Sequence, residues 1–103
     1  MGKTRPVRIR YTLPALADLN AILDYVSDAS PRGSERVKKR IQGIIDLLLD
    51  YPGIGATTDD PSIRRLGTPP YPYLIFYEIA DDDIIIHAIR HAARDPSTMP
   101  GFE

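Results

Sequence analysis

Basic and histidine side chains gather at the end of an apolar run near the C-terminal end of the sequence, where the segment IRHAARDP brings Arg90, His91 and Arg94 close together. A histidine can transfer protons near neutral pH, and guanidinium groups can bind anions, so the cluster could be catalytic, could form a basic contact surface, or could simply be the polar end of a strand. Strict alternation in a β-strand, however, places Arg90 and His91 on opposite faces. The same alternation predicts one face made of Ile85, His87, Ile89 and His91. The cluster is therefore expected to form a contact surface more readily than a single catalytic pocket.

Three other polar features admit both a functional and a structural interpretation. The pair Arg64-Arg65 in SIRRL could bind phosphate or an acidic partner surface, but it equally suits an edge strand protected by charge. His87 lies between apolar neighbours, which favours a partly buried histidine that is satisfied by the sheet. The basic residues of RGSERVKKR are expected to form the solvated side of an amphipathic helix.

Composition and missing motifs exclude several classes of function. The chain of 103 residues has a net charge of −1, which argues against a general nucleic-acid-binding protein. It has no cysteine, no HExxH or EF-hand spacing, no phosphate-binding loop and no serine elbow, so no metal and no cofactor are expected. The start MGKTRPVRIR lacks an apolar signal core, and no apolar run approaches membrane-spanning length. We expect a cytoplasmic protein with a single domain over residues 1–103 and an extended tail over residues 97–103.

Two helices are predicted in the N-terminal half. Thr12 caps a first helix that runs to about Ala29, and Ser30 or Ser34 caps a second that ends near Tyr51. Their apolar stripes are expected to face a core and consist of Leu16, Leu19, Leu23 and Val26 in the first helix and of Val37, Ile41, Ile44, Ile45 and Leu48 in the second.

The remaining elements are predicted as strands. VRIRY near the start, SIRRL, YLIFYEI and DIIIHAIRH have the alternation or β-propensity typical of strands. The order is then β-α-α-β-β-β. This order predicts an α+β fold in which a helix hairpin packs on a small, mainly antiparallel, four-stranded sheet.

The two helices carry more apolar surface than such a sheet can cover. The first adds Ala15, Ile22 and Tyr25 to its core stripe, and the second adds Leu47 and Leu49. Surplus apolar surface of this kind marks a protein–protein interface. The helix hairpin is therefore predicted to bind a partner.

The ordered set of segments resembles the RelE/ParE-family toxins of type II toxin–antitoxin systems over nearly the whole chain. The most specific part is residues 62–96, where SIRRL, YPYLIFYEI, an acidic turn and IIIHAIRHAARDP follow one another. The resemblance implies an α+β toxin that a cognate antitoxin, ParD-like or similar and encoded in the adjacent gene, neutralises in a hetero-oligomeric complex. We expect Ile22, Tyr25, Leu47 and Tyr51 to bind the antitoxin.

The resemblance leaves three functions open, of which the ParE-like one is favoured. A ParE-like toxin poisons DNA gyrase without catalysis of its own, and its target-contact residues would be Arg64, Arg65, Arg90, His91 and Arg94. A RelE-like toxin would instead cleave mRNA in the ribosome, with His91 as acid or base and Arg64, Arg65 and Arg94 as phosphate-stabilising groups. No lysine follows Lys39 and no tyrosine follows Tyr77, so the sequence has few of the catalytic residues that a RelE-like toxin would need. The third possibility is a non-toxic module that only pairs with its antitoxin.

Overall fold

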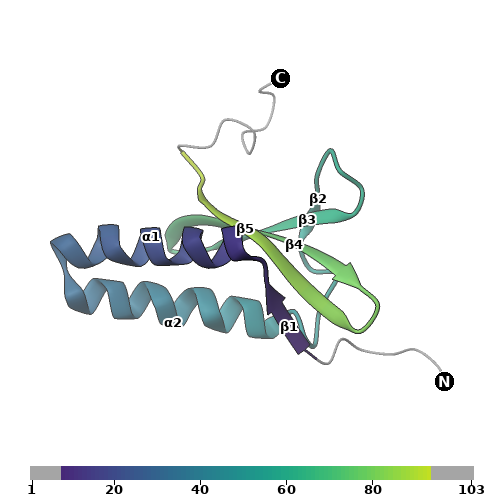
Figure 1. Ribbon diagram of the computed structural model, residues 1–103, viewed down its shortest axis with the longest axis horizontal. Helices are drawn as coiled ribbons and strands as arrows, with labels where there is room; N and C mark the ends of the chain where they lie inside the picture. The colour runs from purple at the N-terminus through teal and green to yellow at the C-terminus, as the bar shows by residue number, and fades with distance from the viewer. Residues whose placement is uncertain (1–7, 94–103) are drawn as a thin grey trace.

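The computed structural model describes residues 8–93, in which a helix hairpin packs against one face of a twisted sheet (Figure 1). The predictions for the tail at residues 97–103 and for Arg94 lie outside these described residues. The elements follow the order β1 (Arg8–Tyr11), α1 (Leu13–Ala29), α2 (Pro31–Leu47), β2 (Ala56–Thr57), β3 (Ile63–Thr68), β4 (Tyr71–Ala80) and β5 (Asp83–His91). The predicted α+β class is confirmed.

The sheet has five strands in the order β1-β5-β4-β3-β2, not the four that were predicted. The additional strand β2 has two residues, too few for any sequence pattern to indicate it. β1 pairs with β5 in parallel, and the other neighbouring pairs are antiparallel. After β1 the chain forms the two helices and then the strands β2, β3, β4 and β5 in turn. The last of these strands, β5, lies beside β1.

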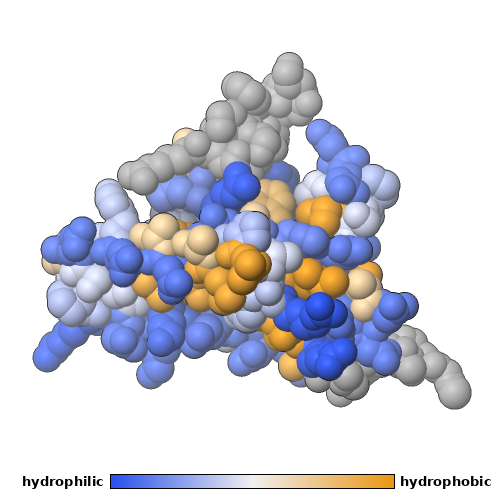
Figure 2. Space-filling model, viewed as in Figure 1, coloured by the Kyte–Doolittle hydropathy of each residue, from blue (hydrophilic) through white to orange (hydrophobic). Residues whose placement is uncertain are grey.

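The helices begin where local capping chemistry predicts. The Thr12 hydroxyl accepts a hydrogen bond from the Ala15 amide at 3.1 Å, and the Ser30 hydroxyl accepts one from Gly33 at 2.9 Å. A proline lies in the first turn of each helix, where it lacks only an amide that has no helical partner. The joined ends of the two helices extend past the sheet (Figure 1), and the outer surface of the hairpin is polar with one apolar area (Figure 2).

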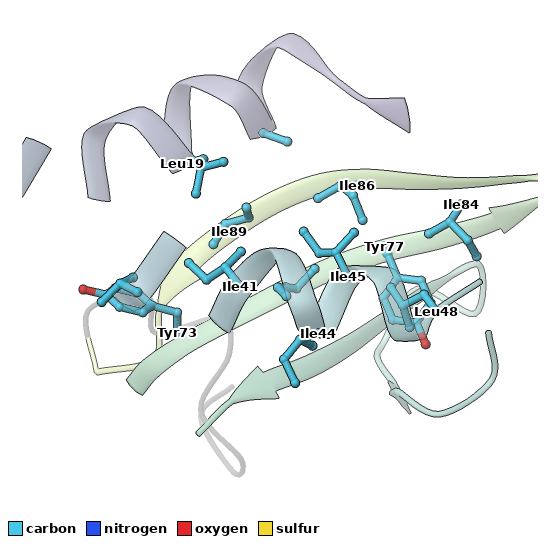
Figure 3. Close-up of a cluster of buried hydrophobic side chains, with 13 residues drawn as sticks. Leu19, Ile41, Ile44, Ile45, Leu48, Tyr73, Tyr77, Ile84, Ile86 and Ile89 are labelled. Atoms are coloured by element: carbon cyan, nitrogen blue, oxygen red, sulfur yellow. The ribbon is translucent and has the colours of Figure 1, made fainter. Parts of the chain in front are cut away.

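The core lies between the hairpin and the sheet (Figure 3). All five residues predicted for the second helix are buried, whereas the first helix departs from the prediction. Leu16 is 41% exposed, while Ala15, which was assigned to the outer stripe, is fully buried. The strands contribute Tyr73, Ile75, Tyr77, Ile84, Ile86 and Ile89.

The N-terminal strand is held by an ion-pair cluster. Asp83 accepts hydrogen bonds from Arg8 Nε at 2.8 Å and from Arg10 Nη1 at 3.1 Å. These two guanidinium groups, Arg8 first, hold the pKa of Asp83 below its ordinary value, and Asp83 in turn raises the pKa of Arg8. The cluster thereby joins β1 to the neighbouring β5, which is the last strand along the chain.

Candidate binding surface on the open face of the sheet

The face of the sheet that points away from the helices carries a pocket of about 450 Å³. Register places Arg65, Phe76 and Ala88 in one row across β3, β4 and β5, and all three are partly exposed. The residues that line the pocket come from the 60–63 loop and these strands, and they are Asp60, Ser62, Ile63, Phe76, Glu78, His87, Ala88 and Arg90.

A β-bulge at His87 builds this pocket. Phe76 lies opposite Ala88 and Tyr77 lies opposite Ile86, so His87 is the additional residue in β5. The bulge shifts the alternation and lets Ile86 and Ile89 both point into the core, which leaves His87 on the open face. The prediction that Ile85, His87, Ile89 and His91 share one face is therefore wrong.

His87 makes the central polar contact of the pocket. Its Nε2 lies 2.8 Å from Glu78 Oε1, and the two side chains are 36% and 31% exposed. The expected partly buried histidine is present, and its partner is a carboxylate on the neighbouring strand. The pair places a proton-carrying ring and a carboxylate side by side in a hollow that solvent reaches.

The rim of the pocket is formed by a turn around Asp60. Ser62 donates to Asp60 Oδ1 from its backbone N at 2.9 Å and from its hydroxyl at 2.7 Å. These two hydrogen bonds hold the pKa of Asp60 below its ordinary value, and the charge of His87 contributes in the same direction. Asp60 is therefore a fixed anionic group opposite the His87–Glu78 pair.

Arg90 and His91 lie on opposite faces, as strand alternation predicts. Arg90 lines the pocket, and its Nε is 3.7 Å from Asp18 Oδ2 on α1. The His91 ring packs edge-on against Tyr73 with centroids 5.6 Å apart, and its Nδ1 accepts a hydrogen bond from the Ala93 amide. His91 thus terminates β5 on the side of the helices and does not reach the pocket.

The two neighbouring arginines of β3 also separate. Arg64 Nη1 donates to the Gly55 carbonyl at 2.7 Å and to the Gly53 carbonyl at 3.3 Å, so Arg64 braces the loop that follows α2. Arg65 lies on the open face beside Phe76. Of the predicted contact residues, the structure brings Arg65 and Arg90 to one face and turns Arg64 and His91 elsewhere.

The predicted antitoxin-binding residues divide between the two ends of the hairpin. Tyr25 is 61% exposed near the joined ends of the helices, whereas Leu47 and Tyr51 are exposed at the other end of α2. The axial separation of Tyr25 and Leu47 is roughly 18 Å, from the rise of an α-helix. Ile22 is partly buried against the core. Sequence reasoning missed further exposed apolar residues, which are Leu13, Leu16, Ile54 and Ile79.

An apolar area is visible on the outer surface, over the half of the hairpin nearer the sheet (Figure 2). Leu13 and Leu16 at the start of α1 are exposed in this half. Within residues 8–93 no helix is long and apolar enough to cross a membrane, and no three metal-ligating side chains gather in a group. The exposed Leu13 and Leu16 agree with a protein–protein contact surface.

Known proteins resemble this chain over most of its length. Residues 9–96 match the family described as ParE toxin of type II toxin-antitoxin system, parDE. Toxin RelE2 of Caulobacter vibrioides is 40% identical over 84% of this chain and 97% of the relative, and Y4kP of Sinorhizobium fredii is 38% identical over 82% and 88%. A solved structure of the chromosomal ParDE TA system from P. aeruginosa has a TM-score of 0.72 at 24% identity and covers 85% of this chain and 98% of that one.

Proposed function

Because the chain belongs to the ParE toxin family of type II toxin–antitoxin systems, we propose that it arrests growth by binding and poisoning DNA gyrase. One observation carries the choice of a binding mechanism over catalysis. Among the described residues of the predicted nuclease site, Arg64, Arg65 and His91 do not converge, since Arg64 braces a loop and His91 packs against Tyr73. Phosphodiester cleavage needs such groups around one phosphate. Arg65 and Arg90, which flank Phe76 on the open face, are better suited to a contact surface.

The proposal is tested with purified gyrase. The toxin is expected to inhibit supercoiling and to raise the amount of cleaved DNA that remains bound to gyrase. Arg65→Gln should lower this potency about tenfold or more, as loss of a central charged contact does. Lys38→Gln, which removes an exposed cation from α2, is the control and should act like the wild type. Gyrase activity that stays unchanged at toxin excess would rule out this target.

We also propose that a cognate ParD-like antitoxin covers exposed apolar surface of the hairpin. Tyr25 and Tyr51 are 61% and 60% exposed, so a glutamate at either position should weaken pairing without unfolding the toxin. Ile22 is partly buried, and a charge there would also destabilise the core. Co-purification with the product of the adjacent gene measures pairing, and circular dichroism checks folding. Undiminished pairing of both variants would place the antitoxin elsewhere.

A second candidate function, ribosome-dependent cleavage of mRNA, is supported by the open-face pocket itself. The pocket holds the His87–Glu78 pair beside Arg90, which is an acid–base group with a cation. His87, and not His91, would then transfer the proton. Toeprinting of translating ribosomes should show cuts that His87→Ala abolishes. If induction of the chain causes no growth arrest at all, the non-toxic pairing module is favoured over both toxins.

A further inference from the structure

A second hollow, of about 450 Å³, lies between α2 and the turn that joins β3 to β4. It is on a different part of the molecule from the open-face pocket and shares no lining residue with it. Three cations of α2 form one wall, since positions three and four apart lie on the same side of a helix. The lining residues are Arg36, Lys39, Arg40, Pro69, Pro70 and Tyr71, and we call this hollow the cationic cleft.

The charge of the two helices is unevenly distributed around the cleft. Helix α1 contains three aspartates and no basic residue, whereas α2 contains five basic residues against Glu35 and Asp46. From residue 61 to residue 77 the only charged residues are Arg64 and Arg65. The cleft is therefore a positive region on a chain whose net charge is −1, and all the charged residues that line it are cations.

One hydrogen bond joins the two sides of the cleft, while two of its cations are available. Arg40 Nε donates to the Pro69 carbonyl at 2.7 Å, which ties α2 to the turn. In the part of the chain that the structure describes, Arg36 and Lys39 form no ion pair and no side-chain hydrogen bond. Tyr71 is partly buried against the core, so its ring provides an apolar floor between these charges.

We infer that the cationic cleft binds a carboxylate-rich peptide segment of a partner protein, with one apolar side chain of that segment against Pro69, Pro70 and Tyr71. Charge complementarity selects an acidic ligand, and the apolar floor selects a ligand with an apolar anchor. The cations span Arg36 to Arg40, roughly 6 Å of helix, which suits two or three carboxylates. A nucleic acid would need a longer basic track, and the acidic α1 side of the hairpin opposes one. This inference does not depend on the gyrase proposal.

The test measures binding of short fluorescein-labelled peptides to the full chain by fluorescence anisotropy. The probe peptide has several Glu and Asp residues around one Leu, and a matched peptide has Gln and Asn in their place. Lys39→Gln and Lys38→Gln form a matched pair, because the two lysines are neighbours in α2 and only Lys39 lines the cleft. Lys39→Gln and Arg36→Gln should each weaken binding of the acidic peptide roughly three- to tenfold, because each removes one charge at the rim of the binding surface. Lys38→Gln should stay within about twofold.

Three results would overturn the inference. The first is equal affinity for the acidic peptide and its Gln/Asn counterpart, or no binding of either. The second is an equal loss of affinity in Lys38→Gln, which would indicate diffuse attraction to the whole helix. The third is tighter binding of a short single-stranded oligonucleotide with the same dependence on Arg36 and Lys39, which would make the cleft a nucleic-acid site. All three cations are exposed, so circular dichroism should confirm that the variants fold.

Discussion

Substitution of Gly55 by alanine tests the closest packing around any glycine that the structure describes. A Cβ atom at this position would lie 2.7 Å from Tyr77 Oη, 2.8 Å from Tyr77 Cε1 and 2.8 Å from the Arg65 carbonyl oxygen. Ordinary contacts between such atoms are about 3.5–4.0 Å, so roughly an ångström of space must open. Tyr77 is fully buried, and the Arg65 carbonyl belongs to β3. Neither neighbour can retreat without disturbing the sheet.

The magnitude follows from two effects of the added methyl group. Overpacking of a filled site costs about 1–3 kcal/mol. The hydrogen bond from the Gly55 amide to Tyr77 Oη, 2.9 Å long, would be strained or lost for about 1 kcal/mol more. Gly55→Ala should therefore lower the free energy of unfolding by about 2–4 kcal/mol, or Tm by roughly 10–30 °C.

Urea unfolding followed by circular dichroism measures this loss, and Gly53→Ala is the matched control. A Cβ at Gly53 meets nothing within 4 Å, so that variant should be unchanged or up to about 1 kcal/mol more stable. In a Tyr77→Phe background, which lacks the nearest of the three clashing atoms, Gly55→Ala should cost less unfolding free energy than it does in the wild type. If Gly55→Ala and Gly53→Ala unfold alike, the loop does not pack on Tyr77 as described.

Three further substitutions test other contacts. Tyr77→Phe should cost about 1–3 kcal/mol of unfolding free energy, because the hydroxyl accepts a hydrogen bond from one loop amide and donates one to a loop carbonyl. Urea titration measures this cost, and a smaller loss would contradict the two hydrogen bonds. Asp18→Ala should leave the Ile89 amide without its acceptor and speed its hydrogen exchange, whereas unchanged exchange would contradict the contact. Because the folded-state pKa of Asp83 is lowered, its stabilisation is present above the ordinary aspartate pKa and is lost as pH falls through the folded value. Asp83→Asn should therefore be less stable at neutral pH and lose less stability in acid, and an acid titration identical to wild type would refute this.

The helices could be predicted from the sequence because their ends depend on local chemistry. The hydroxyls of Thr12 and Ser30 accept hydrogen bonds from amides three residues away. The prolines that follow are tolerated within a helix only in its first turn. The same local view misplaced Leu16, because burial depends on how α1 lies across β5. Ala15, which is fully buried, faces the core in its place.

The bulge in β5 explains the wrong face assignment. Strict alternation can bury Ile84, Ile86 and Ala88, or Ile85, His87 and Ile89, but not all the isoleucines that the core accepts. One additional residue between Ile86 and Ile89 resolves this conflict and places the histidine on the open face. An imidazole in the middle of an isoleucine run is thus a usable signal for a bulge.

The candidate site was only partly predictable, because its contacts join distant parts of the sequence. Alternation already separates Arg64 from Arg65, but nothing local indicates that Arg64 bonds to the Gly55 carbonyl. The His87–Glu78 pair depends on the register of β4 against β5, and that register contains the bulge. The turn at Asp60 reaches the pocket only because β3 lies beside β4.

The way α1 begins also limits how a partner can extend the sheet. β1 pairs with β5 only as far as Ile86, and beyond that point the helix takes over the open edge of β5. Thr12 donates to the carbonyls of Ile86 and His87, and Asp18 accepts from the Ile89 amide. An incoming strand would have to displace the helix to pair there. Among the described residues, strand addition is therefore directed to the outer side of β1 and to the opposite edge of the sheet, where the two-residue β2 covers only part of β3. Copies of this chain are protected from joining edge to edge through β5.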